Sequence, residues 1–147
     1  MTSEFPAGLD RMTLEEVLRL DSDVLSFERL NDQGSMWRAA VSVEGGEPVN
    51  VFIDNGINEL YVQALIPVDY DEITVEERQL VIASAMTALE PYAPVGLAAM
   101  GGRLYLRSAF FIDFCNIHAF TNTLKCIVLA YVAHNRQIPI TAAALQV

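Results

Sequence analysis

The sequence contains no hydrophobic run long enough to cross a membrane, although 52% of its residues are hydrophobic. A membrane-spanning helix needs roughly 20 consecutive apolar residues, and every apolar run in this chain is interrupted well before that length. The first six residues contain neither a basic region nor an apolar stretch of the kind found in secretory signals. We therefore expect a cytoplasmic protein that does not associate with membranes.

Basic residues are scarce: nine Lys and Arg stand against 19 Asp and Glu, which gives a formal net charge of −10. Residues 1–90 hold 18 of the acidic residues and only five of the basic ones. No cluster of Lys or Arg offers a patch for a phosphate backbone, so direct nucleic-acid binding is disfavoured. We interpret the acidic part as a solvated face, with an acidic docking site as the alternative.

Metal-binding and catalytic motifs are also missing. The two cysteines, Cys115 and Cys126, are eleven residues apart, about 16 Å along one helix, so we expect two free buried thiols rather than a disulfide. Zinc needs about four ligands at defined spacing, and Asp113, Cys115 and His118 do not provide them. A Cys–His nucleophile pair would lack an oxyanion loop. We predict no metal, no cofactor and no enzymatic activity.

The remaining ionisable groups are given structural roles. His134 is expected near a helix C-terminus, where its charged form suits the helix dipole. Acidic pairs are interpreted as helix caps or solvated loop residues, because no perturbing environment is evident for them. These pairs are Glu15/Glu16, Asp69/Asp71/Glu72 and Glu76/Glu77.

Local patterns predict a helix, four strands, a helix, two strands and a final helix. Capping boxes at Thr13/Glu16 and Thr74/Glu77 open the first two helices, and paired turn residues such as Gly101-Gly102 predict tight hairpins. The expected ranges are 13–21, 24–30, 36–43, 49–53, 59–66, 74–90, 95–100 and 103–112, with a last helix that begins between 113 and 120 and ends near 137.

Since tight turns join antiparallel strands, this order predicts an α+β fold, α-ββββ-α-ββ-α, with one antiparallel sheet and the helices packed on one face. We expect a single domain over residues 1–147. Within it, residues 1–12 form an N-terminal extension and residues 138–147 a C-terminal tail that docks on the body or on a partner.

From about residue 13 to 137 the chain resembles the bacterial YbjN family, whose fold is shared with the type III secretion chaperones. The resemblance is carried by the element order, by the Val49–Asp54/Asn55-Gly56/Leu60–Ile66 hairpin that leads through an acidic linker into a helix, and by the Gly101-Gly102 hairpin before the last helix. It implies a small dimeric binding protein without enzymatic activity. The extra hairpin strand favours the broader YbjN-like assignment over a secretion chaperone.

Two segments, Leu80–Leu89 and Cys126–Ala133, are apolar nearly all the way round a helix. A helix with one buried stripe leaves polar residues on its far side, so these helices need cover on more than one side. We predict a homodimer, with burial inside one subunit as the alternative. The expected dimer interface consists of Val81, Ser84, Ala85, Met86, Ala88 and Leu89.

Aromatic residues and arginines alternate along the face of the predicted sheet that points away from the helices. This composition is typical of interface hot spots, and a solvated face or a shifted strand register is the alternative. The expected partner-binding residues are Arg38, Phe52, Tyr61, Leu65, Tyr105, Arg107 and Phe111.

Together these features predict a non-enzymatic, chaperone- or adaptor-like homodimer that binds a protein client. Two other functions stay open: a small-molecule-binding sensor that uses a cavity between sheet and helices, and a subunit of an obligate hetero-complex.

Overall fold

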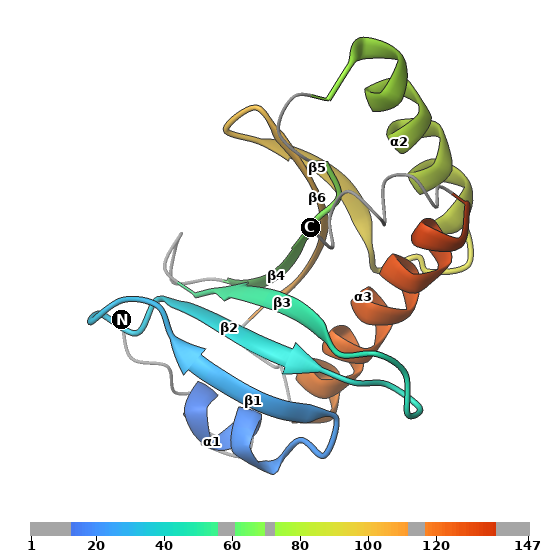
Figure 1. Ribbon diagram of the computed structural model, residues 1–147. Coiled ribbons are helices and arrows are strands. Elements are labelled where there is room, and N and C mark those ends of the chain that lie inside the picture. The colour runs from blue at the N-terminus through green and yellow to red at the C-terminus, as the bar shows by residue number, and fades with distance from the viewer. Residues whose placement is uncertain (1–12, 56–60, 70–72, 112–116, 138–147) are drawn as a thin grey trace.

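The structure of the chain is a computed structural model that describes residues 13–55, 61–69, 73–111 and 117–137 (Figure 1). The elements follow the order α-ββββ-α-ββ-α, so the predicted α+β fold is confirmed. They are α1 (Leu14–Leu20), β1 (Val24–Arg29), β2 (Met36–Val41), β3 (Val49–Asp54), β4 (Tyr61–Pro67), α2 (Val75–Ala88), β5 (Gly96–Met100), β6 (Arg103–Phe111) and α3 (Ile117–Gln137). No helix within these ranges is both long and apolar enough to cross a bilayer.

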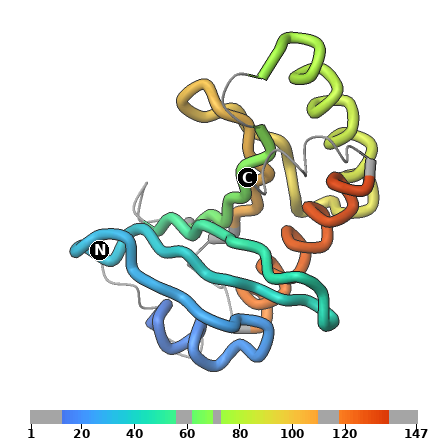
Figure 2. Tube along the Cα trace, viewed as in Figure 1, coloured from blue at the N-terminus to red at the C-terminus, as the bar shows by residue number. Residues whose placement is uncertain are grey.

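The strands form one antiparallel sheet in the order β1-β2-β3-β4-β6-β5. The sheet is strongly bent: β1, β2 and β3 make one arm, and β4, β6 and β5 make the other (Figures 1 and 2). Helix α3 lies against strands of both arms, while α2 packs on α3 and β5 and α1 lies beside β1. The two arms are therefore joined by the sheet and spanned by a single helix.

The sequence signals for helix starts and turns act as predicted. Thr13 Oγ1 accepts a hydrogen bond from Glu16 N at 3.1 Å, and Thr74 Oγ1 accepts one from Glu77 N at 3.1 Å, so both threonine N-caps are confirmed. Gly101 and Gly102 adopt φ values of 58° and 80°, which side chains with a Cβ rarely adopt. This turn lets β5 and β6 form a tight hairpin.

The core lies between the sheet and the helices. Alternate residues of the central strands point to the helices and are buried, including Trp37, Val41, Val51, Val62 and Leu106. The one tryptophan also satisfies its polar atom, because its Nε1 donates to the Gly34 carbonyl oxygen at 2.8 Å. The predicted division into a core face and an outer face is therefore confirmed for β2, β3 and β6. It fails on β4, where Gln63 and Leu65 on the outer face are buried as well.

Asp69 was expected to be a helix cap or a solvated loop residue, and His134 a charged partner of a helix dipole; both are buried. The Asp69 side chain is only 1% exposed; its Oδ1 accepts from Arg103 Nε at 2.9 Å, and Arg78 Nη1 lies 3.7 Å from its Oδ2. His134 is fully buried in the contact between α2 and α3, and burial lowers its pKa, so it does not serve as a charged partner of the helix dipole. Both interpretations from the sequence were wrong, because local position alone does not reveal what other elements bring to a side chain.

Candidate functional site

Several residues predicted to bind a partner lie in one row across the outer face of the sheet. The strand register pairs Arg38 with Phe52, Phe52 with Leu65, and Leu65 with Arg107, so the row crosses β2, β3, β4 and β6. Tyr105 lies two residues from Arg107 on the same strand and therefore on the same face. The structure thus brings these five predicted residues together.

The last two residues of that predicted set lie at one end of the same strand pair. The backbone of Tyr61 on β4 pairs with that of Phe111 on β6. Their side chains lie outside the part of the chain that the structure describes, so their role in a binding surface stays a prediction.

The side chains of the row differ in how they meet solvent. Arg107 is exposed, and Arg38, Phe52 and Tyr105 are partly exposed, whereas Leu65 is buried. Arg38 is held in place, because its Nε donates to Glu28 Oε1 and its Nη1 donates to the Asn50 side-chain oxygen, both at 2.9 Å. The outer face is a fixed surface of aromatic and guanidinium groups.

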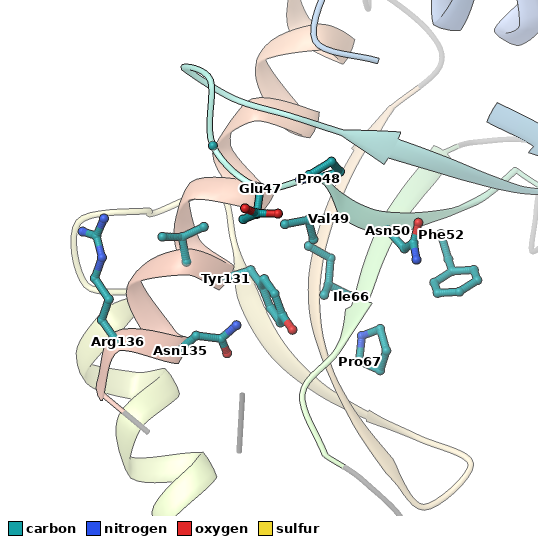
Figure 3. Close-up of a pocket in the computed structure, with 12 residues that line it drawn as sticks. Glu47, Pro48, Val49, Asn50, Phe52, Ile66, Pro67, Tyr131, Asn135 and Arg136 are labelled. Atoms are coloured by element: carbon teal, nitrogen blue, oxygen red, sulfur yellow. The ribbon is translucent and has the colours of Figure 1, made fainter. Parts of the chain in front are cut away.

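The outer face continues into a cleft of about 780 Å³ where β3 and β4 separate. Phe52 belongs to both the row and the cleft. The cleft lies beside the C-terminal half of α3, and Figure 3 shows Tyr131 projecting from that helix toward Val49 and Ile66. The lining residues are Gly46, Glu47, Pro48, Val49, Asn50, Phe52, Ile66, Pro67, Tyr131, Val132, Asn135 and Arg136.

The cleft exists because, among the described residues, β3 and β4 pair over three residues each, ending at Phe52 and Leu65. The next hydrogen-bonded pair would join Asn50 to Pro67. Asn55 N bonds to the carbonyl oxygen of Ser35, just before β2, and the bonding direction alternates along a strand. Proline has no N–H to donate, so the ladder cannot continue in the usual way at this pair. The two strands separate at that point.

The polar groups of the cleft differ in their exposure. Glu47 and Arg136 are exposed at its rim, and Figure 3 shows Arg136 pointing away from the space between the strands. Asn135 lies deeper, and its Oδ1 is buried without a hydrogen-bond partner in the described parts of the chain. The interior of the cleft therefore combines apolar walls with an unsatisfied acceptor.

A second, smaller cleft of about 370 Å³ lies between the end of α1 and the first half of α3. Its lining includes Asp21, Asp23, His118 and Lys125. Asp21 Oδ1 accepts from Asp23 N at 2.9 Å, and burial raises the Asp21 pKa. Among the described residues no three His, Cys, Asp or Glu side chains are grouped so that they could hold a metal ion.

The predicted dimer interface on α2 divides into two parts. Val81, Ser84, Ala85 and Ala88 are buried within the chain, so their burial does not require a second copy. Leu89 is partly buried against the same core, and Met86 is 70% exposed. The sequence reasoning missed two further apolar residues of α2, Val75 and Leu80, which are 70% and 61% exposed. The apolar pattern alone could have indicated them.

Only one of the two cysteines predicted to be free, buried thiols lies within the described residues. Cys126 is a free, partly buried thiol, and burial raises its pKa. Cys115 lies outside the described residues, so the predicted separation of the two thiols stays a prediction.

Comparisons with known proteins do not narrow the assignment. A scan against protein-family models finds no match, and a search of curated proteins finds no significant relative. The resemblance to the YbjN family stays a prediction based on element order and turn positions.

Proposed function

We propose that this chain is a non-enzymatic protein-binding module, chaperone- or adaptor-like, that holds a protein client on the outer face of its sheet. One observation carries the proposal: Arg38, Phe52, Leu65 and Arg107 form a continuous row on a face away from the packed helices. Aromatic residues and arginine are the types most enriched where binding energy concentrates, and this row leads directly into an apolar cleft.

The distribution of perturbed ionisable groups supports a binding role over a catalytic one. Catalytic groups with shifted pKa values normally gather in one cleft. Here the pKa values of Asp21, Cys126 and His134 are shifted by burial, and none of the three lines the cleft beside the row.

We also propose that the module is a homodimer whose second copy covers the outer side of α2. Val75 and Met86, eleven residues apart, are exposed apolar side chains on that side of the helix, and the exposed Leu80 lies about a third of a turn round from them. A cytoplasmic location belongs to the same proposal, because a free thiol such as Cys126 suits a reducing compartment.

The proposal is tested by photo-cross-linking from the outer face. A benzophenone amino acid at Tyr105 should capture a discrete protein in the native host, and the same group at Glu16, exposed on α1, should not. The captured protein is then purified and titrated against the chain. We expect Arg107→Glu to weaken its binding by at least about tenfold while the melting temperature stays close to that of the parent. Equal capture from both positions, or unchanged affinity, would contradict the proposal.

A second candidate function is small-molecule binding in the cleft between β3 and β4. Its volume of about 780 Å³ lies within the usual range for ligand pockets, and the buried Asn135 Oδ1 needs a donor. A metabolite that raises the melting temperature of the parent, but not of a Val132→Trp variant that fills the cleft, would favour this function.

A further inference from the structure

We infer that the cleft between β3 and β4 receives an extended, uncharged segment of the client as a short additional strand along β3. This inference rests on the proposed function and specifies how the client is held. Where the two strands separate, their backbone groups face one another across the cleft. The inference follows from these groups.

The first step concerns the free edge of β3. Along this strand Val49, Val51 and Ile53 direct their N–H and C=O groups to β2, and the alternate residues direct theirs to β4. Beyond Phe52 the strand has no partner on the β4 side within the described residues. Asn50 therefore presents both a backbone donor and a backbone acceptor to the cleft.

The second step concerns the opposite wall. Pro67 is the last residue of β4, and it still pairs with Tyr105 on β6 because its missing N–H lies on the side of β3. The wall formed by β4 thus cannot supply a proton to the Asn50 carbonyl. Asn50 is exposed, so water meets both groups in the free protein. A peptide backbone also both donates and accepts, so an incoming strand can replace that water.

The third step concerns the chemistry of the occupant. The side chains that flank the free edge are apolar on both sides of the strand: Val49 and Ile66 near Tyr131, and Phe52 near Pro67. One acidic and one basic residue, Glu47 and Arg136, lie at the rim, so the cleft selects for neither charge.

The depth of the cleft adds a further hydrogen bond. Asn135 Oδ1 is a buried acceptor that lacks a partner among the described residues, and a backbone N–H of an inserted segment would satisfy it. An uncharged extended segment with small apolar side chains therefore fits both the walls and the polar groups.

The test uses a blocked pentapeptide of alternating threonine and valine, together with its fully N-methylated analogue. The two share side chains but differ in backbone donors. In ¹H–¹⁵N spectra of the whole chain, the parent peptide should shift the Asn50 amide and the Asn135 side-chain signals, and the methylated peptide should not. Equal shifts from both peptides, no shift from either, or shifts confined to the sheet edges β1 and β5 would overturn the inference.

Pro67→Val is the decisive variant because it restores the missing donor. We expect β3 and β4 to pair further, peptide affinity to fall at least about tenfold, and resistance to urea to stay equal or increase. A folding defect cannot produce that combination. Pro94→Val, the same change at an exposed proline outside the cleft, should leave affinity unchanged. Parent affinity in Pro67→Val would overturn the inference.

Asn50→Pro provides a second variant should Pro67→Val fold poorly. It removes the N–H that faces the cleft and leaves the β2–β3 ladder intact, so it too should abolish peptide binding; retained binding would overturn the inference.

The cross-linking and peptide-binding experiments distinguish a failure of this inference from a failure of the proposed function. A client captured from Tyr105 that binds Pro67→Val as tightly as the parent would exclude strand addition but leave the protein-binding module in place. Peptide binding in the cleft without any protein captured from Tyr105 would do the reverse.

Discussion

Ser84 on α2 and His134 on α3 are joined by two hydrogen bonds inside the contact between the two helices. Ser84 Oγ lies 3.2 Å from His134 Nδ1 and 3.3 Å from the His134 carbonyl oxygen. The carbonyl can only accept, so the hydroxyl donates to it and Nδ1–H donates to the hydroxyl. The ring nitrogen Nε2 is then an acceptor, buried without a partner among the described residues.

This arrangement predicts a loss of stability in mild acid. Burial lowers the His134 pKa in the folded state, so the unfolded chain takes up a proton that the folded chain resists. The free energy of unfolding should begin to fall as the pH drops through the unfolded value of about 6.5, and this fall should level off below the folded-state pKa. Urea unfolding at pH about 7.5 and 5.5 measures the effect. A His134→Gln variant should show a smaller fall, and an equal fall in both proteins would contradict the prediction.

The buried carboxylate of Asp69 predicts a large cost for its removal. Asp69→Ala removes the carboxylate that Arg103 and Arg78 share, while their bonds to the backbone oxygens of residues 69 and 102 stay. We expect a loss of about 1.5–3 kcal/mol in the free energy of unfolding, because both arginines can partly rehydrate. The control is Glu15→Ala, which breaks the exposed Glu15–Arg19 pair within α1 and should cost less than about 0.5 kcal/mol. Comparable costs in the two variants would show that Asp69 does not join the β5–β6 hairpin to the start of α2.

The exposed side of α2 predicts a separation between assembly and folding. Met86→Glu should convert a dimer to a monomer and change the unfolding free energy of the subunit by less than about 0.5 kcal/mol, because Met86 is exposed. Val81→Glu, five residues earlier on the buried side, should unfold the chain by placing a charge in the core. Light scattering and circular dichroism measure the two effects. A parent protein that is monomeric at high concentration would contradict the dimer.

The environment of Cys126 predicts slow modification of its thiol. Burial raises the pKa, and the thiolate is the reactive form, so iodoacetamide should label Cys126 more slowly in the folded protein than in urea. A Cys115→Ser background makes Cys126 the one thiol that reports. Equal labelling rates with and without urea would show that Cys126 is not protected.

Much of the fold was predictable because its signals are local. The threonine caps of α1 and α2, the paired glycines between β5 and β6, and the alternation of Trp37, Ala39 and Val41 each depend on residues close in sequence. The row from Arg38 to Arg107 was also predictable in outline, because alternation fixes the faces of each strand once its bounds are known.

The rest depends on contacts between residues far apart in the chain. Arg103 reaches Asp69 from 34 residues away, and Ser84 meets His134 across 50, so neither environment is visible in the local pattern. The cleft could not be predicted either, since the sequence alone shows Pro67 only as a residue that interrupts a strand. That its missing donor points to β3 rather than β6 becomes known only from the register.

The short junction between β3 and β4 also sets the mechanical character of the molecule. Within the described residues, the pairs Phe52–Leu65, Ile53–Ala64 and Asp54–Gln63 join one arm of the sheet to the other. Helix α3 packs across this junction. Because these pairs make the junction, we expect mechanical strain to break the β3–β4 hydrogen bonds first. The two halves of the sheet would then rotate about α3 as rigid bodies.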